Sequence, residues 1–386
     1  MPDTYEIAVV LKRYTPLLLR AYHGIQTFCR ESGVCRCWSR HAPLHMRELL
    51  DGGRCDGIVI FHATRREARQ CRGLRVPAVS FGIEDQGSGL PQVLCDNHAA
   101  GRLGAENLLA RHFFSFGYYD PGGGPAYALR KRGFVDTLRR RGFSCRVLRY
   151  SEGQASLPVW QQRSLEWLHG LPKPAGIMAP QDYCAMRMAQ TCRQAGVAVP
   201  EQAALLGVDN DQAMCDATTP PLSSVDLQPE RWGCEAARLL LMLLRKEKPI
   251  PALVKTPPRG VVERQSTDSI AARDELVREA LVHIRRDVAR AAVTRIASAM
   301  SVSQRTLLTR FRRALGHTPH YELRQARLRQ ARELLVCTDL DLAQVAERSG
   351  FRRAQRLCAV FHEVEGCTPA GYRRRFRSRG WNDPPG

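Results

Sequence analysis

Short runs of apolar residues recur along the first 264 residues, and longer segments with helical spacing of apolar residues lie between several of them. Such runs, bounded by glycine, proline and aspartate, predict buried strands, and the longer segments predict helices. The strand-like runs are residues 6–11, 56–61, 77–82, 176–180 and 203–209. The helical segments are residues 100–111, 131–141 and 183–195. This alternation predicts parallel sheets with helices on both faces.

The pattern changes near residues 265–274. From Asp274 to Arg377 only helical periodicity remains, and short turns separate the predicted helices. The chain lacks a long low-complexity linker and a repeat at solenoid period. We therefore expect an α/β domain followed by an all-α domain.

Two segments of the helical part share one layout. In residues 293–316 an apolar helix reaches Ala299, and a turn leads to Ser303, a residue type favoured at helix N-caps. In residues 342–366 Gly350 marks the turn, and a second arginine-rich helix follows it. Residues 321–335 join the two copies and contain neither glycine nor proline, so they predict an uninterrupted helix.

The location of the basic charge, more than its total amount, indicates a class of partner. The whole chain has a formal net charge of +20 in 386 residues. The last 116 residues contain 23 arginines, no lysine and 12 acidic residues, so they hold a surplus of 11 positive charges. A basic excess concentrated on a helical module favours a polyanionic partner, with nucleic acid ahead of an anionic membrane surface.

Helix, tight turn and a second helix with an outward polar face is the layout of helix-turn-helix DNA recognition. A single copy is also typical of small helical bundles, but two copies joined by a rigid helix favour double-stranded DNA as the partner. We expect the two second helices to enter successive major grooves, about 34 Å apart. The candidate contacts are Ser303, Gln304, Arg305, Thr306 and Arg310 in the first copy, and Arg352, Arg353, Gln355 and Arg356 in the second.

Residues 276–377 resemble the DNA-binding domain of AraC/XylS-type transcription regulators. The sequence SQRTLLTRF at residues 303–311 is similar to the first recognition helix of that family. The pattern AxxxGF at residues 346–351, with VF at 360–361 and TPAGYR at 368–373, resembles its signature. One departure is Ala359, where the family usually has an arginine. The resemblance implies that a phosphate contact at this position is missing.

The first part of the chain resembles the effector domain of LacI/GalR-type repressors. The resemblance rests on residues 93–112, 129–138, 200–211 and 220–244. It implies a periplasmic-binding-protein-like domain, in which two lobes close on a small ligand at a hinge. The order of the two domains resembles that of XylR-like regulators, which respond to xylose.

The expected fold class is thus an α/β two-lobed periplasmic-binding-protein-like domain followed by an all-α domain with two helix-turn-helix motifs. The expected boundaries are residues 1–268 for the effector domain and 269–378 for the DNA-binding domain, with a tail at residues 379–386.

Polar side chains that follow the predicted strands are candidates for the effector site, because ligands in parallel sheets bind beyond the carboxyl ends of the strands. Sugars are held by carboxylates and arginines that bond neighbouring hydroxyl groups. A helix N-cap is the competing role for either aspartate, and a solvated helix residue is the competing role for the arginine that the family resemblance places at the ligand. The candidates are Asp209, Asp182, Arg130, Gln181 and Arg20.

The sequence leaves the effector open. Ala126 and Tyr127 replace the aromatic–serine pair that commonly precedes the ligand arginine in the family. The first loop, residues 11–24, lacks the carboxylate and amide groups that many sugar binders have there. Xylose, another sugar, or an acidic sugar matched to Lys12, Arg13 and Arg20 all remain candidates, and so does a non-sugar effector.

Other functional classes find less support. The start of the chain lacks a signal peptide, no apolar stretch has the length of a membrane span, and the 14 scattered cysteines indicate a reducing, cytoplasmic compartment. No phosphate-binding loop, nucleophile elbow or metal-ligand spacing appears, so we expect neither a cofactor nor a metal. An alkyl-accepting repair regulator is the enzymatic alternative, but no cysteine has an activating neighbour in the sequence. We expect a homodimer that responds to a small molecule, controls catabolic genes more as an activator than as a repressor, and contacts RNA polymerase.

Overall fold

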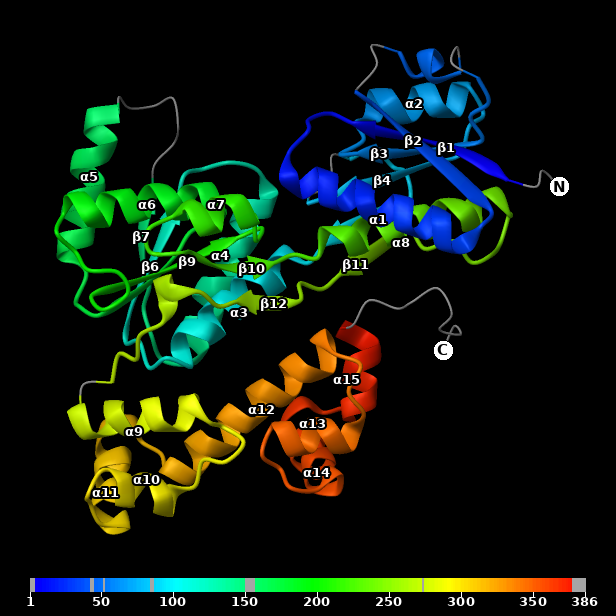
Figure 1. The fold of residues 1–386 in the computed structure, drawn as a ribbon. Coiled ribbons are helices and arrows are strands. Elements are labelled where there is room, and N and C mark those ends of the chain that lie inside the picture. Colours follow the sequence, from blue (N-terminus) through cyan, green and yellow to red (C-terminus); the bar gives the residue numbers. More distant parts are fainter. Residues whose placement is uncertain are drawn as a thin grey trace.

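The computed structural model describes residues 4–41, 45–50, 53–83, 87–149, 157–272 and 274–376. The expected tail, residues 379–386, lies outside the described residues. Figure 1 shows two α/β lobes side by side, with a helical domain below them. Among the described residues, no helix is both long and apolar enough to cross a membrane.

Lobe 1 is a six-stranded sheet with the strand order β11-β5-β4-β3-β1-β2, and all its paired strands are parallel. Helices α1 and α8 pack on one face, whereas η1 and α2 cover the other. The strands are β1 (Tyr5–Leu11), β2 (Cys35–His41), β3 (Gly57–Phe61), β4 (Ala78–Gly82), β5 (Gln92–Cys95) and β11 (Leu253–Thr256). The helices are α1 (Pro16–Ser32), η1 (Met46–Leu49), α2 (Arg65–Gly73) and α8 (Pro229–Leu244).

Lobe 2 is a second six-stranded sheet with the order β12-β10-β9-β8-β6-β7, in which only the edge pair β10–β12 is antiparallel. Helices α3 and α4 pack against each other on one face, and α5, α6 and α7 cover the other. The strands are β6 (Ser115–Asp120), β7 (Arg146–Arg149), β8 (Ala175–Met178), β9 (Ala203–Val208), β10 (Ser223–Asp226) and β12 (Gly260–Val262). The helices are α3 (Asn97–Leu109), α4 (Pro125–Arg140), α5 (Leu157–Gly170), α6 (Asp182–Gln194) and α7 (Gln212–Ala217).

These two sheets confirm the predicted α/β fold. The five apolar runs become β1, β3, β4, β8 and β9, and each is buried along most of its length. The sequence prediction missed the edge strands β2, β7, β11 and β12, which are only partly buried, and also the inner strands β5, β6 and β10. Edge strands bury less of their surface, so their sequences carry less of the apolar signal on which the prediction rested.

The chain crosses between the lobes after β5, after β10 and after β11. At the second crossing Gln228 has a left-handed backbone (φ 55°), and its side-chain amide donates a hydrogen bond to the carbonyl oxygen of Pro257 at the third crossing (3.0 Å). At the first crossing the backbone N–H of Asp96 donates to the carbonyl oxygen of Thr256 (2.9 Å). The crossing segments are therefore bonded to one another and form the hinge between the lobes.

In each lobe, glycines bring two helices into backbone contact. In lobe 2 a Cβ on Gly133 of α4 would lie 2.0 Å from the carbonyl oxygen of His98 in α3, and a Cβ on Gly101 would lie 1.9 Å from that of Arg130. In lobe 1, Gly24 of α1 and Gly233 of α8 meet in the same way. Only glycine permits so close an approach, and it fixes each helix pair as a unit.

The C-terminal domain is built from helices alone. Two small hydrophobic cores fill it, one around Phe311 and one around Phe361, and α12 contributes residues to both. The helices are α9 (Glu275–Arg286), α10 (Val293–Ala299), α11 (Gln304–Leu315), α12 (Pro319–Cys337), α13 (Leu342–Arg348), α14 (Ala354–Glu365) and α15 (Pro369–Phe376). The helix pairs α10–α11 and α13–α14 are the two predicted helix-turn-helix copies, and α12 is the predicted connecting helix.

Lobe 2 contacts the C-terminal domain through the turn that follows α3. The backbone N–H of Ala271 donates to the carbonyl oxygen of Arg111 (2.9 Å), and the Arg111 guanidinium pairs with Glu263 (2.7 Å). Arg285 of α9 lies on the other oxygen of Glu263 (3.7 Å). This region, residues 111–112, 263–272 and 285, is called the joint below.

The glycine contact in lobe 2 generates a prediction. Gly133→Ala should lower the free energy of unfolding by about 1–3 kcal/mol or more, because the added methyl overlaps the backbone of α3. Urea unfolding of the purified protein measures this change. Gly73→Ala is the matched control, because a Cβ there meets no atom within 4 Å. Equal stability of the two variants would contradict the close packing of α3 on α4.

Candidate functional site

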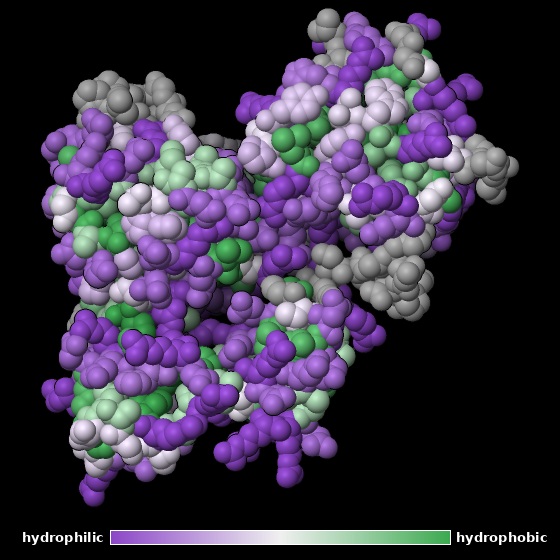
Figure 2. All heavy atoms as spheres, in the orientation of Figure 1, coloured by the Kyte–Doolittle hydropathy of each residue, from purple (hydrophilic) through white to green (hydrophobic). Residues whose placement is uncertain are grey.

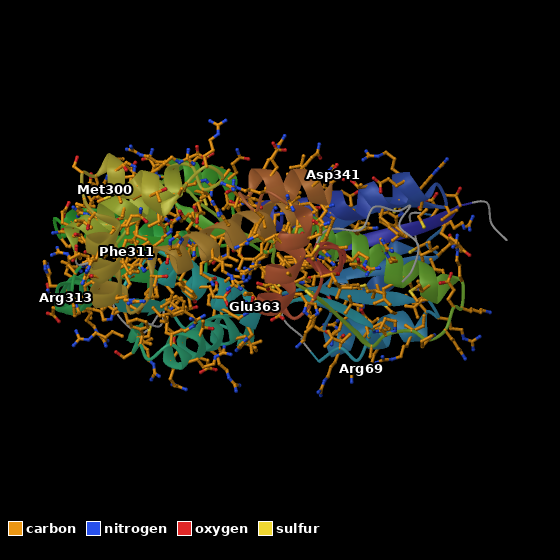
Figure 3. All side chains as sticks on the ribbon, turned by 90° about the horizontal axis from the view of Figure 1, so that it is seen from below. Arg69, Met300, Phe311, Arg313, Asp341 and Glu363 are labelled. Atoms are coloured by element: carbon orange, nitrogen blue, oxygen red, sulfur yellow. The ribbon has the colours of Figure 1, made fainter. Side chains whose placement is uncertain are left out.

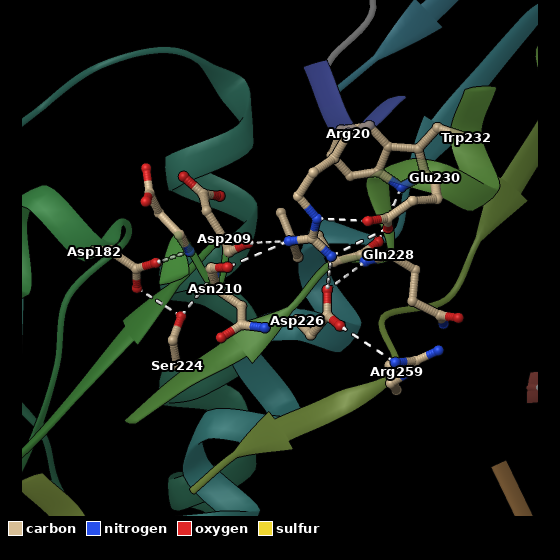
Figure 4. A network of polar contacts seen from close by, with 12 residues as sticks. Arg20, Asp182, Asp209, Asn210, Ser224, Asp226, Gln228, Glu230, Trp232 and Arg259 are labelled. Atoms are coloured by element: carbon tan, nitrogen blue, oxygen red, sulfur yellow. Dashed lines mark hydrogen bonds and ion pairs between the residues drawn. The ribbon is translucent and has the colours of Figure 1, made fainter. Parts of the chain in front are cut away.

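A cleft with a volume of about 530 Å³ lies between the two lobes. Residues 15–17 and Arg20, at the start of α1, line it from lobe 1, and residues 181–183 and 209–214 line it from lobe 2. Its size is typical of small-molecule sites. Figure 4 shows that polar side chains from both lobes converge there.

Asp209 occupies the end of β9, where the sequence predicted a ligand residue. Its backbone has φ 110°, a conformation that non-glycine residues rarely adopt, and Asn210 after it also has a positive φ of 51°. Such strain persists only where the surrounding structure fixes it, and it is commonly found at functional sites. The Asp209 side chain lines the cleft although the residue is only 7% exposed.

Arg130 lies behind Asp209 instead of on the cleft wall. It is only 1% exposed, so the alternative of a solvated helix residue is wrong. Its Nε donates to Oδ1 of Asn97 (2.9 Å), and its Nη1 lies 3.4 Å from Oδ1 of Asp209. Burial raises the pKa of Asp209, and the Arg130 charge opposes that rise. The guanidinium thus holds the carboxylate in place from within lobe 2.

Asp182 lines the same cleft and is held by two donors. Its Oδ1 accepts from the hydroxyl of Ser224 (2.6 Å), and its Oδ2 accepts from the backbone N–H of Asp211 (2.8 Å). Burial, followed by the nearby Asp209 carboxylate, raises the pKa of Asp182 to about 8. Two acidic groups in one buried site disfavour each other's ionisation, so this pair tends to retain a proton at neutral pH.

The helix-cap alternative is wrong for both aspartates. The N-cap of α7 is Asp211, whose side chain accepts from the backbone N–H of Met214, and the N-cap position of α6 is Gln181. Gln181 itself lines the cleft, and its side-chain oxygen accepts from the Tyr127 hydroxyl (2.7 Å). Asp182 and Asp209 are therefore free of a capping role.

Arg20 bridges the lobes at the hinge side of the cleft. Its guanidinium forms a bidentate pair with Glu230 of lobe 1 (2.6 and 3.1 Å) and also contacts Asp226 of lobe 2 (3.2 Å). It donates as well to the carbonyl oxygens of Asp209 and Asn210 (both 3.3 Å), as Figure 4 shows. Bidentate arginine–carboxylate pairs are strong and fix orientation, so Arg20 couples the first helix of lobe 1 to the strained loop of lobe 2.

Several lining residues were missed by the sequence reasoning. They come from the loop after β9, from the end of β10 and the start of α8, and from the residues flanking β12, and they are Asn210, Asp211, Asp226, Glu230, Arg259 and Arg264. An available signal was the acidic residue at the end of β10, Asp226, followed by Glu230 in the first turn of the next helix. The basic residues Lys12 and Arg13 do not line the cleft; Lys12 instead pairs with Glu67 (2.8 Å).

A larger cavity of about 820 Å³ lies at the joint, between Phe114 of lobe 2 and Val282 of α9. Charged residues such as Lys173, Glu201 and Glu279 line it, but the interlobe cleft gathers carboxylates, amides and guanidinium groups from both lobes that hydrogen-bond to one another. Convergent polar groups decide small-molecule recognition more than volume does. The interlobe cleft is therefore the candidate ligand site.

A second candidate site is the exposed surface of the two helix-turn-helix copies. Figure 3, which looks from below, shows both copies on the side of the molecule that faces away from the two lobes. Hydrophilic side chains project from this edge in Figure 2. All nine candidate contact residues are exposed, and they are Ser303, Gln304, Arg305, Thr306, Arg310, Arg352, Arg353, Gln355 and Arg356.

In the first copy, α11 begins as predicted at the N-cap Ser303, whose hydroxyl oxygen accepts from the backbone N–H of Thr306 (3.0 Å). Leu307 and Phe311 bury the inner face of the helix. Arg310 is bound by an ion pair to Asp274, the N-cap of α9 (2.7 Å). Among the candidates of this copy, the side chains of Gln304 and Arg305 take part in none of the described hydrogen bonds or ion pairs.

In the second copy, α14 begins at Ala354, so two of the candidate arginines precede it. Arg353 occupies the N-cap position, and Arg352 precedes it with a left-handed backbone (φ 58°). Uninterrupted helical spacing would place Arg352 and Arg356 on one helical face. They do not share a face, because Arg352 lies outside the helix. Gln355 and Arg356 lie in the first turn of α14, where recognition helices contact base edges.

Arg373 has a structural role. Its Nε donates to the carbonyl oxygen of Leu335 near the end of α12 (3.1 Å), and its Nη2 donates to that of Leu340. The first bond satisfies a carbonyl group that a helix leaves unpaired at its C-terminus, and the second reaches the segment between α12 and α13. The neighbouring Arg374 is exposed.

Comparison with known proteins assigns each domain. A family profile for periplasmic binding protein-like domains matches residues 105–267, and one for helix-turn-helix domains matches residues 296–375. The xylose operon regulatory protein of Escherichia coli (strain K12) is 32% identical over 214 residues, which are 55% of this chain and 55% of that protein. The match thus spans about half the length of that relative.

Two further likenesses cover more of the chain. The xylose operon regulatory protein of Haemophilus influenzae is 28% identical over 329 residues, or 82% of this chain and 84% of that protein. The solved structure of the xylose-binding transcription activator XylR has a TM-score of 0.61 at 23% identity, and covers 98% of this chain and 100% of that one. This chain has a XylR-like architecture. It combines a periplasmic-binding-protein-like domain with a helix-turn-helix domain.

In α14 the chain departs from the AraC/XylS-type signature that it resembles. Leu357 is buried in the core of the second copy, and the exposed position after Cys358 is Ala359. An alanine cannot donate a hydrogen bond to phosphate, so the basic groups of this copy are displaced toward the turn at Arg352 and the start of α14.

The exposed arginines of this XylR-like chain generate a prediction. Arg356→Ala should relax sequence preference at one base pair, with a cost of about 1–3 kcal/mol at that position. Arg374→Ala is the comparison, because an arginine on phosphate weakens all sequences alike and reduces the salt slope by about one unit. Binding of an operator series at several salt concentrations separates the two effects. Uniform loss of affinity in Arg356→Ala would assign base reading to α11 instead.

Proposed function

We propose that this chain is a ligand-responsive, sequence-specific DNA-binding transcription regulator. The observation that carries the proposal is the presence, in one chain, of a polar cleft between two lobes and of two exposed helix-turn-helix copies. The relatives that match it are transcription regulators. A catalytic role is not proposed.

The proposed effector is a sugar or a sugar acid. Asp182, Asp209 and Gln181 offer acceptors and donors for neighbouring hydroxyl groups, and arginines at the rim offer partners for a carboxylate. The relatives are named for xylose, and solved structures with the fold of the effector domain are described with cellobiose, D-xylulofuranose or ribose bound. Xylose is therefore the first sugar to test, and the Arg20, Arg259 and Arg264 side chains make sugar acids the second class.

In the proposed DNA complex, α11 and α14 enter successive major grooves. Arg305 and Gln304 of the first copy, and Arg353, Gln355 and Arg356 of the second, supply the base contacts. Arg310 and Arg352 are proposed to contact the DNA phosphate backbone. Arg310 is held by Asp274, and Arg352 lies in the turn before α14. The arginine surplus of the C-terminal part steers the domain toward DNA.

Ligand binding is proposed to act by closing the lobes. Closure changes the Arg20 network at the hinge and the position of α3, which begins at the hinge and ends at the joint. The changed joint then alters how the helix-turn-helix copies approach DNA, which is a coupling free energy between two sites. Residues 1–268 are the proposed effector domain and residues 269–378 the DNA-binding domain.

The oligomeric state, the cellular location and the direction of regulation are proposed on the same basis. We propose a homodimer in the cytoplasm that acts more as an activator than as a repressor of catabolic genes, with RNA polymerase as a further partner. Activators of the RhaR type match the C-terminal part; that of Enterobacter sp. (strain 638) is 39% identical over 75 residues, or 19% of this chain and 27% of that protein.

A substitution in the cleft tests the proposal. Thermal-shift screening of pentoses, hexoses and sugar acids first identifies a ligand that stabilises the protein. Asp209→Asn should then weaken that ligand about ten- to hundredfold, because a hydrogen bond to a charged group contributes about 1.5–3 kcal/mol. The isosteric amide keeps an oxygen for the Arg130 contact, so DNA affinity without ligand should remain unchanged.

Asp136→Asn, on the outer face of α4 in the same lobe, is the matched control and should leave both affinities unchanged. Fluorescence anisotropy with labelled operator DNA, with and without the ligand, gives both constants. Normal ligand affinity in Asp209→Asn would remove Asp209 from the site. Failure of every sugar and sugar acid to stabilise the wild-type protein would contradict the proposed effector class.

A further inference from the structure

Three potential metal ligands from the two domains meet beside the joint. His112 follows α3 in lobe 2, whereas His317 and Glu322 lie just before and within the first turns of α12 in the DNA-binding domain. One donor atom of each lies within 4.8 Å of the other two. Neither the effector cleft nor the DNA-facing helices use these side chains.

The distances do not fit direct hydrogen bonds. Nε2 of His112 lies 3.6 Å from Oε2 of Glu322, and Nε2 of His317 lies 3.7 Å from the same oxygen. Hydrogen bonds from nitrogen to oxygen span about 2.7–3.2 Å. Nε2 of His112 is buried and has no hydrogen-bond partner among the described residues. The imidazole therefore points a polar atom into the cluster without satisfying it.

The same distances fit a shared cation. At metal–ligand distances of about 2.0–2.2 Å, two ligand atoms on a tetrahedral ion lie about 3.3–3.6 Å apart. The His112–Glu322 distance lies at the upper end of that range and the His317–Glu322 distance just above it, whereas the donor atoms of the two histidines, which lie within 4.8 Å of each other, move together when an ion binds. Two imidazole nitrogens and one carboxylate oxygen are a ligand set that suits Zn²⁺ and related divalent transition metals.

The surroundings orient the ligands. Nη2 of Arg329 donates to Oε1 of Glu322 (3.2 Å), which leaves Oε2 facing the two histidines. Nδ1 of His317 lies 3.4 Å from the carbonyl oxygen of Thr318, as expected for a ring that turns its other nitrogen to a metal. The His317 side chain is 25% exposed, against 12% for His112 and 6% for Glu322, so a solvent path and a fourth coordination position remain on its side.

We propose that His112, His317 and Glu322 bind a divalent transition-metal ion, with Zn²⁺ as the reference ion, and that this ion fastens the effector domain to the DNA-binding domain. One ligand belongs to the turn after α3 and two belong to the start of α12. Binding therefore restricts the movement of one domain against the other, and the cell's supply of the metal becomes a second input to the protein.

Equilibrium dialysis of the full-length protein with Zn²⁺ tests the site. We expect about one equivalent of tightly bound Zn²⁺, and His112→Gln and His317→Gln should each weaken it at least tenfold, since even the loss of an outer-shell partner typically costs that much. His320→Gln is the matched control, because His320 is exposed on the same segment and lies outside the cluster. It should bind Zn²⁺ as the wild type does.

Two further measurements separate this site from the cysteines and from misfolding. Co²⁺ bound to the reduced protein should show the visible absorption of nitrogen and oxygen ligands without the near-ultraviolet band of thiolate ligands. Without metal, the midpoint of thermal unfolding should be the same for His320→Gln and the two ligand variants. Loss of Zn²⁺ binding in the ligand variants then cannot be attributed to loss of the fold. Zn²⁺ should also slow proteolysis between residues 265 and 274 in the wild type and in His320→Gln, but not in the two ligand variants.

The proposal is overturned if the wild type binds no Zn²⁺, if either histidine variant binds it as tightly as His320→Gln does, or if the Co²⁺ complex shows a thiolate band. Zinc binding without protection of residues 265–274 would overturn the fastening role. None of these results depends on the effector, so the metal site can fail while the proposed regulator function stands.

Discussion

The buried guanidinium of Arg130 is the constraint on which the effector domain depends. A charge that is 1% exposed is tolerated only when it is paired and hydrogen-bonded, and here the partners are Asp209, Asn97 and the carbonyl oxygen of Pro180. These partners lie at the end of β9, at the start of α3 and just before α6. One side chain of α4 thus fixes the positions of the elements that carry the lobe 2 side of the cleft.

The same contact explains how a ligand in the cleft can affect residues at the joint. Helix α3 begins beside Arg130 and ends beside the joint, and its 13 residues span about 20 Å at a rise of about 1.5 Å per residue. The glycine contact holds α3 rigidly against α4. A movement of the cleft wall would therefore reach Arg111 and His112 as a displacement of a stiff unit, without requiring the core of lobe 2 to deform.

The sequence predicted the most apolar strands and the helix-turn-helix copies well, but it missed the inner strands β5, β6 and β10 and much of the local conformation. Buried strands such as β1 and β9 and the helix pair around Ser303 were predictable, because burial on both faces and capping chemistry leave strong local patterns. The sequence also indicated Asp182, Asp209 and Gln181 as cleft residues. It did not indicate that Arg130 lies behind the wall, that Arg352 is left-handed, or that Asp226 and Glu230 hold Arg20, because those depend on contacts between segments far apart in the chain.

The central claim is that the effector cleft and the joint are coupled through α3. Hydrogen exchange measured by mass spectrometry, with and without the stabilising sugar, tests it directly. The account predicts that the sugar changes the exchange of backbone amides in the turn at residues 110–113 and at Ala271, as well as those at residues 209–214. It is contradicted if the sugar changes exchange only around the cleft while DNA affinity still responds to it.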